Sequence, residues 1–175
     1  IRHVYTRYLQ GWGNPLKDCP RVWRFDHKQS GSGTLADLGS HMLDLVHFLT
    51  GDTYARCVAQ NGTFMHERRS IDPAKNGAME KVDVDDYAHY FAVTKGGIAA
   101  SFEISRNGFG RGNFQHIEIY GDKGALRFNL MDANYLYYFD NTQKEDVFGG
   151  ERGFKQIECV QRFDAPGGLF PSSKS

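Results

Sequence analysis

The sequence has little of what marks several large classes of protein. Only three of its 175 residues are cysteine, and none stands in a CxxC pair. This excludes a disulfide framework and a thiolate zinc site, and it favours a reducing compartment. Lysine and arginine total 21, as do aspartate and glutamate, so there is no basic excess for nucleic acid or anionic lipid. No apolar run approaches the roughly 20 residues of a membrane-spanning helix. We therefore expect a cytoplasmic protein that binds neither nucleic acid nor membranes.

Motifs that hold nucleotides are also missing. The glycine-rich stretch 108–113 has its third glycine one place too early for G-x-G-x-x-G, and strand-like residues follow it instead of a helix. No P-loop and no G-x-S-x-G serine motif occurs. We expect this chain alone to bind neither NAD nor NADP.

The start of the chain lacks both an initiator methionine and a signal peptide, and strand-like alternation begins at once. We interpret the chain as a piece of a longer protein. Its domain is predicted to span residues 1–165, with an unpacked tail over 166–175.

Aromatic residues, at 14%, and 20 glycines favour β-structure with many turns. Short turns join most of the predicted strands, and such turns require antiparallel neighbours. One helix is predicted over 35–49 by its apolar period, with Thr34 as N-cap and Gly51 just past its end. The fold class is α+β, a predominantly antiparallel open sheet with helices packed on one face. The predicted strands are 1–9, 54–65, 84–94, 98–105, 115–120, 125–129 and 135–139.

Three polar residues of the predicted helix share one side. Asp37, His41 and Asp44 are spaced i, i+4 and i+7, which places them within a sector of about 60°. A histidine flanked by carboxylates can be oriented and can accept or donate a proton. A solvated helix face, with Asp37 completing a capping box, explains the same spacing. His47 lies about 240° from His41 around the helix, so we expect no metal site.

Two tryptophans precede this helix. Trp12 and the pair Trp23-Arg24 lie in predicted loops. An aromatic platform beside a guanidinium can hold a sugar ring or an anion. The alternative is that both rings close the end of the sheet.

Several segments together resemble a known family. Trp23-Arg24-Phe25-Asp26 is followed at 30–45 by SGSGTLADLGSHMLDL, which contains D-x-G-x-H-x-x-D. Segments 101–106, 110–113 and 117–126 agree as well. The chain resembles, over about residues 8–139, the C-terminal domain of the Gfo/Idh/MocA oxidoreductases, without their Rossmann domain.

This resemblance implies the substrate-binding and oligomerisation domain of an NAD(P)-dependent sugar or polyol dehydrogenase. Asp37 and His41 match the family's substrate-contacting pair, with His41 as the general base during hydride transfer. Asp44 is expected to hold His41 or a backbone amide. The resemblance also suggests weaker contacts to the substrate or the nicotinamide from Gln10, Trp12, Trp23 and Arg24.

The resemblance further implies an upstream dinucleotide-binding domain that holds NAD or NADP, and a helix beyond residues 153–171, so both ends look truncated. We expect a homodimer or tetramer formed through the open sheet face, where aromatic-rich strands would leave apolar surface. The alternative function is a non-catalytic ligand-binding or dimerisation domain.

Overall fold

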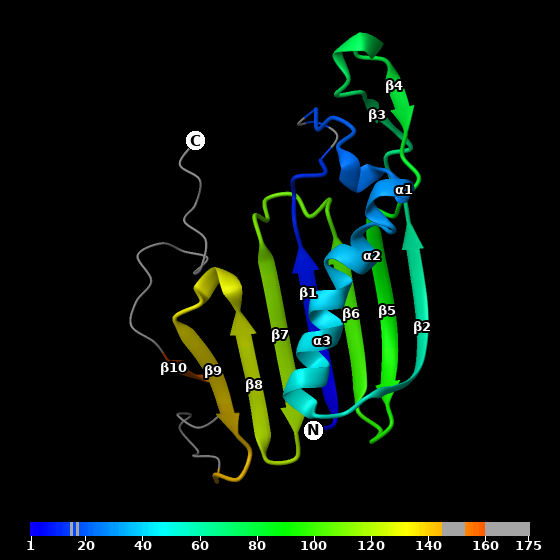
Figure 1. Ribbon diagram of the computed structural model, residues 1–175. Helices are drawn as coiled ribbons and strands as arrows, with labels where there is room; N and C mark the ends of the chain where they lie inside the picture. Colours follow the sequence, from blue (N-terminus) through cyan, green and yellow to red (C-terminus); the bar gives the residue numbers. More distant parts are fainter. Residues whose placement is uncertain (15, 17, 145–152, 160–175) are drawn as a thin grey trace.

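The computed structural model describes residues 1–14, 16, 18–144 and 153–159, and its main feature is one open sheet (Figure 1). Eight strands follow the order β10-β9-β8-β7-β1-β6-β5-β2. All neighbours are antiparallel except β1 and β6, which run parallel. The predicted mostly antiparallel open sheet is therefore confirmed. The strands are β1 (His3–Leu9), β2 (Tyr54–Gly62), β5 (Tyr87–Thr94), β6 (Ala99–Ser105), β7 (Phe114–Gly121), β8 (Gly124–Asn129), β9 (Tyr135–Asp140) and β10 (Lys155–Glu158).

Two further parts of the chain extend this picture. A separate hairpin, β3 (Glu67–Arg69) and β4 (Met79–Lys81), extends beyond one end of the sheet, with the 3-10 turn η3 (Pro73–Lys75) at its tip. A second short turn, η4 (Leu130–Asp132), joins β8 to β9. The edge strand β10 was not predicted from the sequence. The predicted tail at 166–175 lies outside the described residues.

Side chains of the strands alternate between the two faces, as the period of a strand requires. In β1 the residues Val4, Thr6 and Tyr8 are buried, whereas Tyr5 and Arg7 are exposed on the opposite face. This alternation is the pattern from which the strand was predicted.

The predicted continuous helix over 35–49 is interrupted. Its residues form α2 (Thr34–Asp37) and α3 (Gly39–Thr50), with Leu38 between them. The interruption lies where the Tyr90 hydroxyl of β5 donates to the Gly39 carbonyl at 3.3 Å. Gly51 ends α3 with φ 67°, the left-handed conformation that glycine adopts without strain, as predicted. The shorter turns η2 (Trp23–Phe25) and α1 (His27–Ser30) precede α2.

The predicted capping box is wrong. The N-cap of α2 is Gly33, and Thr34 is a fully buried helical residue. The carboxylate of Asp85 caps the helix instead, accepting from the backbone N–H of Gly33 at 3.1 Å and of Leu35 at 2.7 Å. A Cβ at Gly33 would lie 2.3 Å from the Asp85 carbonyl oxygen, so this approach requires glycine.

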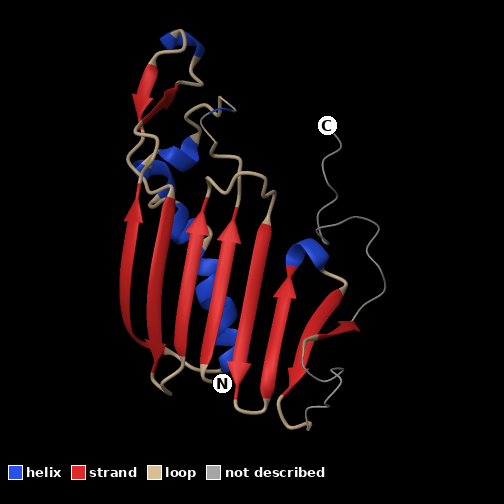
Figure 2. Cartoon of the chain, turned by 180° about the vertical axis from the view of Figure 1, so that it is seen from behind, coloured by secondary structure: helices blue, strands red, loops and turns tan. Residues whose placement is uncertain are grey.

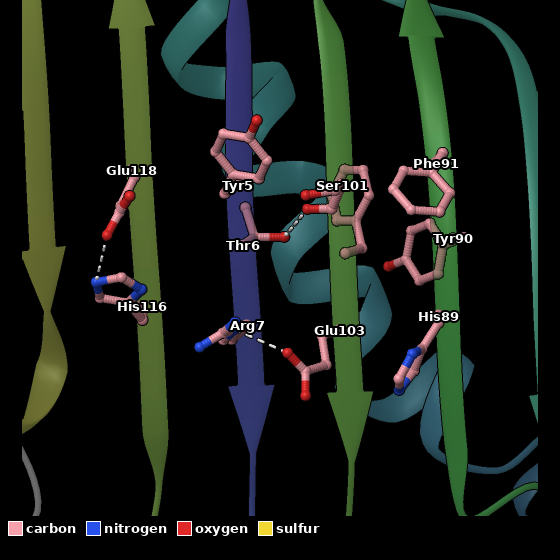
Figure 3. A pocket seen from close by; sticks show the side chains of 11 residues that line it. Tyr5, Thr6, Arg7, His89, Tyr90, Phe91, Ser101, Glu103, His116 and Glu118 are labelled. Carbon is pink, nitrogen blue, oxygen red and sulfur yellow. Dashed lines mark hydrogen bonds and ion pairs between the residues drawn. The ribbon is translucent and has the colours of Figure 1, made fainter.

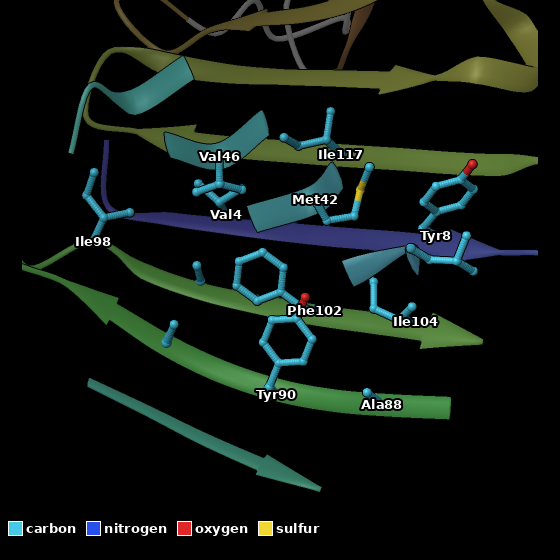
Figure 4. Packing of buried hydrophobic residues seen from close by; sticks show 13 residues of the cluster. Val4, Tyr8, Met42, Val46, Ala88, Tyr90, Ile98, Phe102, Ile104 and Ile117 are labelled. Carbon is cyan, nitrogen blue, oxygen red and sulfur yellow. The ribbon is translucent and has the colours of Figure 1, made fainter. Parts of the chain in front are cut away.

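The main core lies between α3 and the sheet (Figure 4). Met42 and Val46 of α3 share one buried cluster with strand residues such as Val4. Within it the rings of Tyr90 and Phe102 stack at 4.4 Å. Figure 2 shows the opposite face of the sheet, where no helix lies in front of the described strands.

Candidate functional site

A cleft of about 560 Å³ opens where β1 and β6 end and their loops meet the start of the helical segment. It collects most of the site residues predicted from the sequence. The loop after β1 supplies two, the short turn η2 one, and α2 and α3 one each. The predicted residues that line it are Gln10, Trp12, Arg24, Asp37 and His41, beside Tyr8, Val22, Leu38, Gly112 and Asn113.

Two predicted residues are not part of this cleft. Trp23 is 49% exposed and does not line it, although the Arg24 guanidinium lies 4.3 Å from the centre of its ring. Asp44 is exposed beside a smaller hollow that also touches His41. No hydrogen bond joins Asp44 to His41 or to a backbone amide in the described part of the chain. A role for Asp44 in holding His41 therefore has no support from the geometry.

His41 lies in the first turn of α3 with its ring exposed to the cleft. The ring centroid of Tyr8 is 6.0 Å away, which makes Tyr8 its aromatic neighbour. Among the described residues the imidazole nitrogens of His41 make no hydrogen bond. Both nitrogens are available to a ligand.

Asp37 ends α2 and is held by arginine, not by His41. Its Oδ2 accepts from Nη2 of Arg106 at 2.9 Å and lies 3.8 Å from Nε of Arg24. The Arg106 side chain is 1% exposed, so Asp37 neutralises a charge that water cannot reach. The second oxygen, Oδ1, makes no hydrogen bond to the described residues and can accept from a ligand.

Below the cleft, two arginines enclose the buried ring of Phe25. Arg68 and Arg106 have their guanidinium carbons 4.1 Å and 5.9 Å from the ring centroid. Arg68 also donates to the carbonyl of Gly13 at 2.6 Å, which fixes the loop after β1. The Trp12 ring packs on Phe25 at 5.4 Å and also lines the cleft.

Sequence reasoning assigned no role to Arg106, Tyr8 or Asn113. Tyr8 and Asn113 join Gln10 and Trp12 in a chain of hydrogen bonds along the wall of the cleft. Arg106 and Asn113 lie in segments that carried the family resemblance, which was a signal that could have drawn attention to them. Tyr8 could have been placed from its inward position in β1.

With this geometry in place, known proteins can be compared. The model of the GFO/IDH/MocA C-terminal domain matches residues 1–127. The chain belongs to this family.

The individual relatives of this GFO/IDH/MocA domain are named as oxidoreductases or dehydrogenases. Levoglucosan dehydrogenase from Pseudarthrobacter phenanthrenivorans is 29% identical over 173 residues, covering 94% of this chain and 43% of the relative. An oxidoreductase domain protein from Kribbella flavida is 36% identical with a TM-score of 0.82, covering 97% and 46%. A levoglucosan dehydrogenase in complex with NADH and L-sorbose is 30% identical with a TM-score of 0.82, covering 98% and 43%. The chain thus spans less than half the length of these relatives.

The described residues of this GFO/IDH/MocA domain offer little to a dinucleotide phosphate or a metal ion. The glycine-rich loop 107–113 leads into β7, so it offers no helix N-terminus for a pyrophosphate, and the residues do not fit the phosphates of a dinucleotide. Within the same residues no cluster of three or more metal-ligating side chains occurs. No helix there is long and apolar enough to cross a membrane.

Proposed function

We propose that this domain binds a sugar or polyol and supplies the general base for its oxidation by an intact NAD(P)-dependent dehydrogenase. The observation that carries the proposal is the single cleft that gathers Asp37, His41, Gln10, Trp12 and Arg24. Relatives that are levoglucosan dehydrogenases, one of them complexed with NADH and L-sorbose, support the substrate class.

His41 acts on the proton of the reacting hydroxyl. Its neutral imidazole accepts the O–H proton while the C–H bond breaks and the C–O bond becomes a carbonyl. The hydride that leaves the carbon would be accepted by a nicotinamide bound to the intact protein. The exposed ring of His41, without a hydrogen bond to the described residues, supports this role.

Asp37 binds the substrate without taking its proton. Its Oδ2 is occupied by Arg106, which leaves Oδ1 to accept from a neighbouring hydroxyl. Arg24, in the same cleft, can donate to a sugar oxygen, and Trp12 offers a ring edge beside it. We propose no substrate contact for Trp23 and no positioning role for Asp44.

NAD or NADP is proposed to bind mainly to residues outside this chain, because the described residues lack a cradle for its phosphates. The chain alone is then expected to bind no dinucleotide. We also propose a cytoplasmic location, in keeping with the free thiols of Cys19, Cys57 and Cys159.

The test of this function is turnover of a panel of sugars and polyols by the intact protein. His41→Ala should lower kcat by about 10²–10⁴-fold, the usual contribution of a positioned acid–base group. His27→Ala is the matched control, because His27 is an exposed histidine of α1 that does not line the cleft. Wild-type kcat in a folded His41→Ala variant would exclude His41 as the base.

A second function, self-association, is favoured by the sheet face opposite α3. Figure 3 shows this face, where Arg7 pairs with Glu103 at 2.8 Å beside a hollow of about 560 Å³. Phe91 is 69% exposed and Tyr5 48% exposed on the same face. We propose that this face stays free of helices in the intact protein and packs against a second copy, forming a homodimer or tetramer. A domain that only binds ligand or dimerises, without catalysis, remains the alternative if no panel compound is turned over.

A further inference from the structure

Four side chains along the wall of the cleft form a hydrogen-bonded chain with a fixed direction. It begins at Trp12, whose Nε1 lies 2.6 Å from Oε1 of Gln10. An indole N–H can only donate, so the oxygen of Gln10 must face Trp12. The amide nitrogen of Gln10 therefore faces the other way.

The next hydrogen bond of the chain runs from Gln10 to Asn113. Nε2 of Gln10 lies 2.8 Å from Oδ1 of Asn113, and a donor there requires an oxygen opposite it. The Tyr8 hydroxyl donates to the same oxygen at 2.8 Å and accepts from Gln10 at 3.3 Å. Both neighbours thus hold the oxygen of Asn113, and its amide nitrogen turns away from them.

The amide nitrogen of Asn113 is left with no partner among the described residues. Asn113 is half-buried and lines the same cleft as Asp37 and His41. The two loops that carry this chain are locked together, because Gly108 N–H donates to the Gln10 carbonyl at 2.8 Å. A Cβ at Gly11 would lie 2.9 Å from the Gly108 carbonyl oxygen, so the loop backbones are in close contact. The amide is held in place with unused donors.

We propose that Nδ2 of Asn113 donates a hydrogen bond to a sugar oxygen near the hydroxyl that His41 deprotonates, and that Gln10, Trp12 and Tyr8 set its direction. Asn113 is then a specificity-determining residue, and this inference rests on the proposed function. A site built to hydrogen-bond a substrate oxygen discriminates against the analogue that lacks it, because its own polar group is left unpaired.

Two substitutions test the direction of the chain by different routes. Asn113→Asp keeps an acceptor for Tyr8 and Gln10 but removes the donor. Gln10→Glu leaves Asn113 in place and keeps the acceptor for Trp12. It removes the donor to Asn113 and gives the Tyr8 hydroxyl a carboxylate to donate to, so the Asn113 amide turns its nitrogen toward that carboxylate and its oxygen toward the cleft. Both variants should weaken binding of the parent sugar about 10–100-fold, the range for an unpaired buried polar group.

The measurement is calorimetric titration of the intact protein with a sugar that it binds and with a set of its singly deoxygenated analogues. One of these analogues should bind to wild type, Asn113→Asp and Gln10→Glu with equal affinity. That analogue lacks the oxygen to which Asn113 donates. Gln60→Glu is the charge control, since Gln60 is exposed on β2 and lines neither this cleft nor the smaller hollow beside His41. It should leave the discrimination unchanged.

A uniform loss across all analogues in the two variants, or no loss at all, would overturn the inference, because a merely structural role cannot distinguish one oxygen. Because binding is read separately from turnover, a wild-type protein that binds sugars without oxidising them would contradict the proposed dehydrogenase and still decide the role of Asn113. Absence of any sugar binding would overturn both.

Discussion

Removal of the Asp37 carboxylate should destabilise the domain through Arg106. The Arg106 side chain is 1% exposed and its Nη2 donates to Asp37 Oδ2 at 2.9 Å. Taking one partner from a buried ion pair costs about 3–5 kcal/mol, because the other charge stays buried without compensation. Asp37 is 37% exposed, so water screens part of the interaction and the expected loss for Asp37→Asn is about 1–3 kcal/mol.

The assay is a double-mutant cycle measured by urea unfolding of the intact protein. The Arg106→Met background removes the buried charge that Asp37 neutralises, and Asp37→Asn should then cost less than about 0.5 kcal/mol. In kinetics, Asp37→Asn should raise KM more than it lowers kcat, because Asp37 makes no hydrogen bond to His41. Equal costs of Asp37→Asn in both backgrounds would refute the reasoning.

Gly33 and His116 give two further stability predictions. Gly33→Ala should lower the free energy of unfolding by about 1–3 kcal/mol, because the new Cβ would meet the backbone of Asp85. Thermal melting measures the loss. Gly112→Ala is the control, because a Cβ there would have no atom within 4 Å. Burial lowers the pKa of His116, so as pH falls the unfolded chain takes up the proton first and stability drops below about pH 6.5. His116→Gln should reduce this loss in melts between pH 7 and pH 5, whereas His89→Gln, an exposed neighbour on the same face, should not.

Local sequence patterns were enough to predict much of the fold. The alternation of Val4, Tyr5 and Thr6 identified β1, and the turn at 95–97 identified the hairpin of β5 and β6. The spacing of Asp37 and His41 placed both side chains in one cleft even though α2 and α3 are separate helices. The break at Leu38 divides the predicted helix in two, but the side chains of Asp37 and His41 still face the same cleft.

Long-range contacts explain what the sequence did not reveal. The cap of α2 comes from Asp85, 52 residues away from Gly33, so no local motif could disclose it. Asn113 meets Gln10 across 103 residues. The parallel pairing of β1 with β6 likewise depends on the strand order of the whole open sheet and not on a turn.

The most direct test of the account is a crystal structure of the intact protein with a bound sugar and a nicotinamide dinucleotide. We expect one sugar hydroxyl within about 2.6–3.2 Å of a His41 ring nitrogen, the reach of a general base. We also expect Asp37 Oδ1 and Asn113 Nδ2 to contact oxygens of the same sugar. A sugar bound elsewhere, with His41 far from every hydroxyl, would contradict the assignment of this cleft as the substrate site.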